Sequence, residues 1–168
     1  MSMKLIQATA AHTEVLRNLL EKYLYEFGQY DGRMPGADGL YGYRWLPNYF
    51  TDDDRYAFLL MTEEGLPAGF AMVNKHFSYE QDCDWAVAEF FVLHGYRRGG
   101  AGSAMMRELF AKFPGKWEIM YHPNNKVSAV FWNRMGAEQG QYRRVLQSEV
   151  CYDDGTAAEF VYCVSGEK

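Results

Sequence analysis

A basic glycine turn is the segment of this chain whose residue types best suit an anionic ligand. Residues 95–109 read GYRRGGAGSAMMREL, with two adjacent arginines, four glycines and then an apolar pattern with helical spacing. The first N–H groups of a helix lack partners within it, and glycine lets a phosphate approach them closely. Arg97 and Arg98 add charge-assisted donors. The turn therefore predicts a pyrophosphate site, and the alternative is a plain strand-to-helix link with solvated arginines.

Two common nucleotide motifs do not fit this turn. A P-loop requires a lysine in GxxxxGK[ST], and no lysine occupies that place. A dinucleotide fingerprint, GxGxxG, begins at Gly100 and Gly102, but Met105 stands at its third glycine position. What remains is a strand, a basic glycine turn and a helix N-terminus.

Glu89 is the one ionisable residue inside an otherwise apolar run, Trp85–Leu93 (WAVAEFFVL). A buried carboxylate without partners is costly, so we expect this side chain to face a cleft or water. Partial burial would raise its pKa toward neutrality and make it a better general base. The alternative is a structural glutamate paired with an arginine or with the backbone.

The segment FFVLHGYRRGGAG, residues 90–102, resembles the signature of the GNAT N-acetyltransferase superfamily. That signature is a Gln/Arg-x-x-Gly-x-Gly/Ala turn after the fourth strand, and Arg97, Gly100 and Gly102 match it. The resemblance implies acetyl-CoA as the cofactor, with its pyrophosphate on the turn and its pantetheine arm along the strand. The residues implied for this first block are Phe91, Val92, Leu93, Arg97, Arg98, Gly99, Gly100, Ala101, Gly102 and Ser103.

A second block supports the same resemblance. The family often shows Asn-x-x-Ala-x-x-x-Tyr-x-x-x-Gly after its fifth strand, and Asn125, Ser128, Trp132 and Gly136 fall at that spacing. The resemblance implies that Asn125 contacts the cofactor arm near the thioester. It extends the cofactor-binding set to Asn125, Ser128, Phe131 and Trp132.

Acetyl transfer to an amine needs a base, donors for the thioester oxygen and a way to release the thiolate. The resemblance supports Glu89 as the base, and a backbone N–H of Val92 or Leu93 is a candidate oxyanion donor. Many relatives protonate the thiolate with a tyrosine where this chain has Trp132, whose indole N–H can donate a hydrogen bond but is no practical acid. We expect Tyr142 or Tyr121 to substitute, or solvent to serve. The missing tyrosine also motivates the alternative of a non-catalytic acyl-CoA-binding module.

The segment YEFGQYDGRMPGADGLYGYRW, residues 25–45, is the most distinctive part of the chain. In the resembling family this region often walls the acceptor site, so we expect Tyr25, Tyr41 and Tyr43 to form an aromatic face for an amine. The alternative is an aromatic loop that packs on the sheet. Further candidates are Tyr30 and Trp45 for the aromatic face, Glu26, Asp31 and Asp38 for negative charge, and Arg33 or Arg44 for a substrate carboxylate.

The elements that must position these residues alternate between strands and helices. Apolar residues recur at helical spacing from Ala11, including Tyr23 and Phe27, and Gly28 is expected to end that helix. The order β-α-α-β-β-β-α-β-α-β-β predicts one α/β (α+β) domain over residues 1–168, and the resemblance implies a GNAT-like fold with a mixed, mostly antiparallel sheet flanked by helices. The expected strands are Met3–Ala8, Arg55–Thr62, Ala68–Lys75, Trp85–Leu93, Lys116–Tyr121, Tyr142–Tyr152 and Ala157–Val164. The expected helices after the first are Arg44–Phe50, Gly102–Phe113 and the segment from Asn125 to Met135.

Composition narrows the class of partner. The chain has 168 residues and a formal net charge of −5, so nucleic acid and anionic membranes are poor partners, whereas a small-molecule amine is compatible. Three widely spaced cysteines and no apolar leader at the N-terminus favour a reducing, cytoplasmic setting. The four histidines form no metal motif, so no metal is expected. A peptide or protein N-acetyltransferase is the remaining alternative, and pairing of the C-terminal strands into a homodimer is a further expectation.

Overall fold

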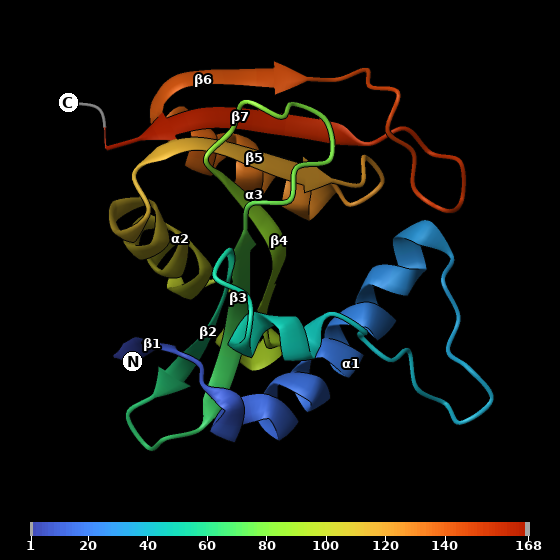
Figure 1. Cartoon of the computed structure of the whole chain (residues 1–168), viewed down its shortest axis with the longest axis vertical. Coiled ribbons are helices and arrows are strands. Elements are labelled where there is room, and N and C mark those ends of the chain that lie inside the picture. Colours follow the sequence, from blue (N-terminus) through green and yellow to red (C-terminus); the bar gives the residue numbers. More distant parts are fainter. Residues whose placement is uncertain (1, 167–168) are drawn as a thin grey trace.

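Seven strands form a single sheet in the order β1-β2-β3-β4-β5-β7-β6 in this computed structural model, which describes residues 2–166 (Figure 1). The strands are β1 (Met3–Gln7), β2 (Arg55–Thr62), β3 (Pro67–Asn74), β4 (Trp85–Val92), β5 (Gly115–Tyr121), β6 (Gly140–Val145) and β7 (Glu159–Ser165). Every neighbouring pair is antiparallel except β4 and β5. The mixed, mostly antiparallel sheet and the order of elements are therefore confirmed.

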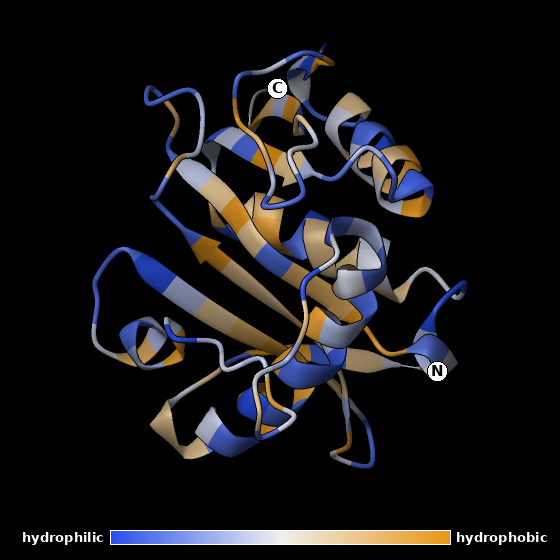
Figure 2. Ribbon diagram, turned by 90° about the vertical axis from the view of Figure 1, so that its right-hand side faces the viewer, coloured by the Kyte–Doolittle hydropathy of each residue, from blue (hydrophilic) through white to orange (hydrophobic). Residues whose placement is uncertain are grey.

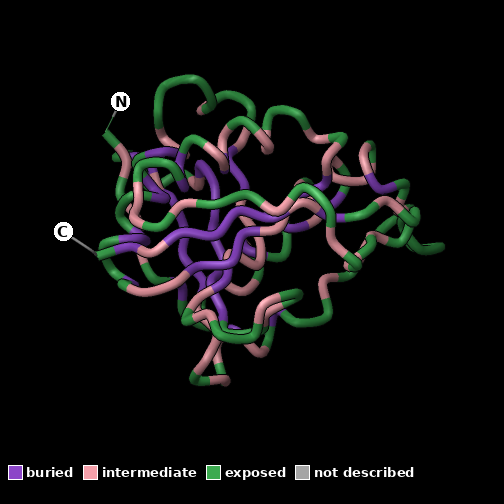
Figure 3. The backbone as a smooth tube through the Cα atoms, turned by 90° about the horizontal axis from the view of Figure 1, so that it is seen from above, coloured by how far each residue is buried: buried purple, intermediate pink, exposed green. Residues whose placement is uncertain are grey.

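Helices cover both faces of this sheet. The helices are α1 (Thr13–Asp31), α2 (Ala101–Lys112) and α3 (Lys126–Ala137), with short 3-10 turns η1 (Ala10–His12), η2 (Leu46–Phe50) and η3 (His94–Tyr96). One apolar cluster joins α1 and η2 to strands β2, β3 and β4, and a second joins α2 and α3 to the opposite face. Apolar residues follow the strands of the sheet in Figure 2, and in Figure 3 buried backbone runs through the middle of the molecule with exposed segments around it. The sheet thus separates an α1 side from an α2/α3 side.

Helix α1 is longer than its sequence indicates. Gly28 does not end it; the helix continues to Asp31, and Gly32 closes it in the left-handed region at φ 77°. A Cβ at position 28 would lie 3.0 Å from the carbonyl oxygen of Arg33, so this glycine allows the chain after the helix to fold back closely. A glycine inside a helix therefore serves packing here rather than termination.

Strand β6 is shorter than expected. The predicted strand Tyr142–Tyr152 is regular only over Gly140–Val145, and beyond it a single bridge joins Cys151 to Ala157. Residues 146–150 between them lie outside the sheet, because the pairing of β6 with β7 ends at Val145, opposite Phe160. The sequence pattern shows extended residues but does not show where their partner strand stops.

Strands β4 and β5 separate soon after they meet. Their parallel pairing covers only Trp85–Val87 against Trp117–Ile119. Directly after it, the register of β4 against β3 shifts between Met72 and Val73, so Ala88 is an extra, bulged residue. The remainder of β4 pairs with β3 on one side and leaves its other edge open beside the end of β5.

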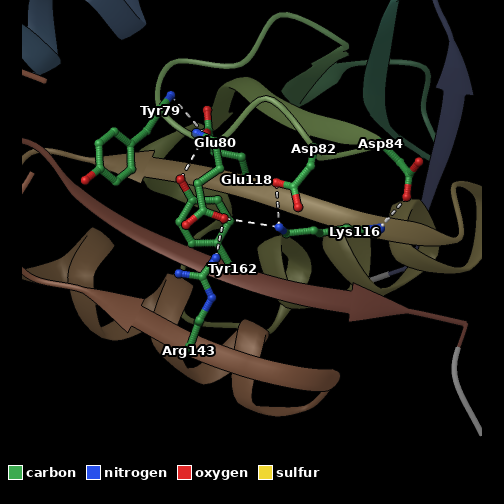
Figure 4. A network of polar contacts seen from close by, with 8 residues as sticks. All are labelled: Tyr79, Glu80, Asp82, Asp84, Lys116, Glu118, Arg143 and Tyr162. Carbon is green, nitrogen blue, oxygen red and sulfur yellow. Dashed lines mark hydrogen bonds and ion pairs between the residues drawn. The ribbon is translucent and has the colours of Figure 1, made fainter.

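The connection between β3 and β4, residues 75–84, crosses to the other half of the sheet. It runs in front of β5 and β7 in Figure 1, while α3 lies behind them. The buried Glu118 of β5 accepts hydrogen bonds from the backbone N–H groups of Ser78, Tyr79 and Glu80 and from the hydroxyl of Tyr162. We call residues 75–84 the strap (Figure 4).

No helix within the described part of the chain is both long and apolar enough to cross a bilayer.

Candidate active site

A cleft of about 790 Å³ lies where β4 and β5 diverge. Its lining comes from the open edge of β4, the end of β5, the glycine turn and helix α3 on one side, and from α1 on the other. Among its lining residues are Tyr23, Glu26, Phe27, Tyr30, Glu89, Phe90, Phe91, Val92, Arg98, Gly100, Gly102, Ser103, Tyr121, His122, Asn125, Ser128, Phe131, Trp132 and Arg134. The cleft therefore brings together the glycine turn, Glu89 and the second sequence block.

The glycine turn presents the N-terminus of α2 to this cleft. Gly100 is the N-cap residue in the left-handed region at φ 84°, and Arg98 also has a positive φ of 68°. A left-handed N-cap followed by Ala101, Gly102 and Ser103 leaves the first N–H groups of the helix facing outward. This arrangement suits a pyrophosphate, and Arg98 adds an exposed charge beside it.

Arg97 is engaged with the protein rather than free to point at a ligand. Its two terminal nitrogens donate to the carboxylate of Glu26 at 2.7 Å each, and its Nε donates to the carbonyl oxygen of Val92 at 2.6 Å. The ion pair lowers the pKa of Glu26, with His94 as a second partner. Arg97 thus links α1 to the turn, a pairing that the sequence motif alone does not reveal.

The backbone of β4 alternates between its two edges. Leu93 donates its N–H to Ala68 of the neighbouring chain segment, and the Phe91 carbonyl points toward Gly69 of β3. Because antiparallel pairs alternate, the N–H of Val92 faces the open edge and the cleft. Of the two expected oxyanion donors, Val92 is brought to the site and Leu93 is not.

Glu89 lies on the α1 side of the cleft, partly buried. Burial raises the pKa of its carboxyl to about 7, while hydrogen bonds from the hydroxyls of Tyr23 and Tyr43 and the charge of Arg33 act in the opposite direction. The extra residue at Ala88 interrupts the alternation of side chains along β4. Val87 therefore packs on the α2/α3 side, whereas Glu89 shares the α1 side with Phe91. A carboxyl group with this pKa can accept a proton near neutral pH.

Of the two tyrosines expected to serve as an acid, Tyr121 lines the cleft and Tyr142 does not. Tyr142 lies outside its lining and donates to Oδ1 of Asn133, whose amide nitrogen in turn donates to the Tyr121 hydroxyl. Tyr121 does line the cleft, and burial raises the pKa of its phenol. Trp132 is 6% exposed and packs edge-on against Phe90, so it forms part of the cleft wall.

Residues of the second block also line the cleft, and the structure adds roles to them. Asn125 is the N-cap of α3, because its Oδ1 accepts the N–H of Ser128 at 3.1 Å, and its amide nitrogen can donate to a ligand. Phe131 packs at a tilt against Phe90, with 5.4 Å between ring centroids. Ser103 accepts a hydrogen bond from Arg134, which ties α2 to α3 beside the turn.

The three tyrosines expected at the acceptor site lie in different places. Tyr43 reaches Glu89 with its hydroxyl, whereas Tyr25 is 76% exposed on the outer face of α1. Tyr41 packs with its hydroxyl near Gly28 and donates its N–H to Glu21, outside the cleft lining. The segment after α1, residues 32–45, thus packs on that helix, and of the three tyrosines only Tyr43 reaches the candidate active site, at Glu89.

The α1 side of the cleft, which we call the acceptor side, contains Tyr23 and Phe27, which sequence reasoning assigned only to helix packing, and Tyr30, which it named for the aromatic face. Tyr23, Phe27 and Tyr30 of α1 line the cleft, spaced four and three residues apart on one helical face. Their spacing was visible in the sequence, but the same spacing also predicts an ordinary core stripe. Buried His122 is a further residue of the lining; its Nε2 lies 3.1 Å from Asp154, and its Nδ1 accepts the N–H of Asn124.

The cleft fits acetyl-CoA by the chemistry of its donors. Backbone N–H groups at the start of α2, with Arg98 nearby, would hold the pyrophosphate, and the open edge of β4 at Phe90 and Val92 offers strand-like hydrogen bonds to an amide-containing arm. Arg134 lines the same side and adds positive charge, whereas Arg107 is paired with Glu138. The lining therefore offers backbone donors, Arg98 and Arg134 to the group, while Arg97 is paired with Glu26 in this structure.

Comparison with known proteins agrees with this geometry. Residues 14–137 match the sequence model of the Acetyltransferase (GNAT) family. No curated protein sequence matches the chain significantly.

Several solved structures share the fold over nearly the whole chain. An acetyltransferase from Thermus thermophilus superposes with a TM-score of 0.71 at 16% identity, covering 98% of this chain and 97% of its own. The ribosomal-protein-S18-alanine N-acetyltransferase from Escherichia coli gives 0.65 at 10% identity, covering 99% and 96%. AAC(6')-Iy in complex with a bisubstrate analogue, CoA-S-monomethyl-acetylneamine, gives 0.58 at 20% identity, covering 90% and 100%. At these identities the likeness shows the fold alone.

Proposed function

Because the chain belongs to the acetyltransferase (GNAT) family, we propose that it acetylates the primary amine of a small molecule by direct attack, with Glu89 as the general base. The observation that carries this proposal is that Glu89 lines the acceptor side of the cleft that also contains the glycine turn, where burial raises the pKa of its carboxyl to about 7. A base with a pKa near neutrality is matched to deprotonating an amine at physiological pH. The hydroxyls of Tyr23 and Tyr43 hold the carboxylate in place.

Acetyl-CoA supplies a thioester carbonyl that the amine attacks, forming a C–N bond and breaking the C–S bond. Glu89 takes the proton that the amine loses, and the cleft-facing N–H of Val92 is placed to donate to an oxygen that gains negative charge. Trp132 offers only a hydrogen bond to the sulfur. A thiol of pKa about 8.5 is a tolerable leaving group without an acid, so Tyr121 and water are both sufficient as final proton donors.

Three cysteines, Cys83, Cys151 and Cys163, are free, which supports the proposal that the protein works in a reducing, cytoplasmic compartment.

Titration with acetyl-CoA and a thiol-release assay on a panel of amines test the proposal. We expect binding at micromolar concentration and a kcat/KM that rises through about pH 7 as Glu89 loses its proton. Glu89→Gln should lower kcat about 100-fold or more and leave the Kd of acetyl-CoA within about threefold. The matched control, Glu64→Gln in the exposed turn between β2 and β3, should leave both unchanged.

Three outcomes would contradict the proposal in different ways. Absence of acetyl-CoA binding would remove it altogether, and binding without thiol release on any amine would indicate the alternative of a non-catalytic acyl-CoA-binding module. Activity on peptides but not on free amines would indicate a peptide or protein N-acetyltransferase, the kind of activity for which the Escherichia coli protein is named.

A further inference from the structure

We propose that the acceptor is a primary amine carried on an aromatic or apolar body that has no carboxylate near the amine. This inference rests on the proposed function and narrows its substrate class. It follows from two properties of the α1 side of the cleft: its wall is aromatic, and its positive charges are already paired.

The wall consists of Tyr23, Phe27 and Tyr30, which we call the aromatic wall. Their ring centroids are 5.9 Å apart between Tyr23 and Phe27 and 6.3 Å apart between Phe27 and Tyr30. All three line the cleft on one face of α1, and the Tyr23 ring also packs 5.8 Å from Phe91 of β4. A row of rings of this kind offers dispersion contact to an apolar body and a favourable face to an ammonium group.

The wall is backed by a fixed framework. Phe27 packs against Tyr152 from the segment before β7 at 5.9 Å between centroids, and Tyr152 in turn packs on His122 at 4.7 Å. Arg33 lies over the Phe27 ring at 5.0 Å. Rings held by neighbours in this way lose little freedom when a ligand binds, which favours recognition by shape.

Two arginines lie beside the aromatic wall: Arg33 over the Phe27 ring and Arg97 in the cleft lining. Both form ion pairs within the protein. Arg33 pairs with the buried Asp31 at 2.6 Å, and Arg97 pairs with Glu26 at 2.7 Å. A substrate carboxylate would have to displace one of these ion pairs, and in doing so would leave a protein carboxylate without its partner.

His122, the remaining candidate donor for a substrate carboxylate, is also occupied. His122 is fully buried, and its two ring nitrogens face Asp154 and the N–H of Asn124. Within residues 2–166, the acceptor side thus pairs each of Arg33, Arg97 and His122. The proposed function places the amine beside Glu89, so an amine with an adjacent carboxylate would bring two like charges together, which disfavours its binding.

Three compounds of one skeleton separate charge from shape: 2-phenylethylamine, phenylalanine and phenylalaninamide. With the full-length protein and acetyl-CoA, we expect kcat/KM for 2-phenylethylamine to exceed that for phenylalanine by about 100-fold or more. Phenylalaninamide, which keeps the size but not the charge, should fall within about tenfold of 2-phenylethylamine. Equal or better turnover of phenylalanine, or a preference for peptides over all three, would overturn the inference.

Variants of the wall test the first half of the inference, that the amine is carried on an aromatic or apolar body. Phe27→Ala and Tyr30→Ala should each lower kcat/KM for 2-phenylethylamine about tenfold, with the Kd of acetyl-CoA unchanged. Tyr25→Ala on the exposed face of the same helix is the matched control and should have no effect. An equal effect of all three variants would overturn the role of the wall.

Calorimetric titration of the protein without acetyl-CoA keeps this inference separate from the proposed function. We expect 2-phenylethylamine to bind more tightly than phenylalanine even if no transfer occurs, and Phe27→Ala to weaken that binding. If acetyl-CoA binds and is consumed but the amines bind in the reverse order, the proposed function stands and the substrate class is wrong.

Discussion

Glu89 combines a catalytic position with a cost in stability. Burial raises the pKa of its carboxyl to about 7 in the folded protein, against about 4.3 for a glutamate in an unfolded chain. Between these two values the unfolded state has released the proton and the folded state still holds it. The free energy of unfolding therefore falls as the pH rises through this window, and it has lost the full contribution above pH 7.

Replacing the carboxyl group should remove that pH dependence. We expect Glu89→Gln to raise the free energy of unfolding by about 1–3 kcal/mol at pH 8. Near pH 4.5 it should have little effect, because glutamate and glutamine at position 89 are both neutral in the folded protein at that pH. Urea denaturation at several pH values measures the difference. Glu64→Gln, in an exposed turn, should change stability by less than about 0.5 kcal/mol throughout. A less stable Glu89→Gln at pH 8 would mean that Tyr23, Tyr43 and Arg33 fully compensate the buried charge.

At the scale of elements, the pair Glu26–Arg97 connects the acceptor helix with the glycine turn. The bidentate geometry and the third bond to the Val92 carbonyl fix the guanidinium between α1 and β4. Arg97 then acts on the acceptor side by positioning α1, while Arg98 of the same turn is exposed beside the helix N-terminus.

A double-mutant cycle tests this division of roles. We expect Glu26→Gln and Arg97→Gln each to raise the KM of the amine about three- to tenfold, with non-additive effects in the double variant, because both remove one ion pair. The Kd of acetyl-CoA should stay within about threefold in each, whereas Arg98→Gln should weaken acetyl-CoA binding severalfold. If Arg97 instead contacts the pyrophosphate, Arg97→Gln will weaken acetyl-CoA binding about tenfold and Glu26→Gln will strengthen it.

Sequence patterns that depend on neighbouring residues predicted the strands and helices well. They could not predict contacts between residues far apart in the chain. The sequence located the strand with Glu89, the glycine turn and the helix that follows Asn125 because each depends on neighbours within a few residues. It could not show that Arg97 pairs with Glu26, because these residues are 71 positions apart. Nor could it place Tyr142 away from the cleft, since that depends on where β6 crosses α3. The role of Gly28 inside α1 likewise depends on the return of the chain at Arg33.

At the scale of the whole molecule, the sheet consists of two halves that share only a short ladder. Strands β4 and β5 pair over three residues each, Trp85–Val87 and Trp117–Ile119. On the α2/α3 side the halves share one apolar cluster, and on the opposite face the strap crosses from β3 to the half that contains Glu118. The two halves of the sheet separate at the cleft, and contacts on both faces of the sheet therefore hold them together.

Glu118 holds the strap and should be a sensitive point of the fold. It is 2% exposed and accepts hydrogen bonds from three backbone N–H groups. Glu118→Gln should lower the free energy of unfolding by about 2–4 kcal/mol, because the neutral amide replaces a carboxylate that accepts charge-assisted hydrogen bonds in a buried site. Glu80→Gln, in the same network but half-buried against Lys116 and Arg143, should cost at most about 1 kcal/mol. Equal losses in urea denaturation would mean that the ion pairs, rather than Glu118, hold the strap.

Acetyl-CoA should stabilise the molecule as a whole, because the cleft that fits it is lined by β4 from one half of the sheet and by β5 and α3 from the other. A ligand that binds only the folded state raises the free energy of unfolding by about 2.7 kcal/mol at 100 times its Kd. We expect this gain in the wild type and in Glu118→Gln alike, so saturating acetyl-CoA should restore much of the stability that the variant loses. Urea denaturation with and without acetyl-CoA measures both gains. A gain in the wild type that disappears in Glu118→Gln would mean that the strap is needed to form the cleft, and that the two faces of the sheet do not hold the halves together independently.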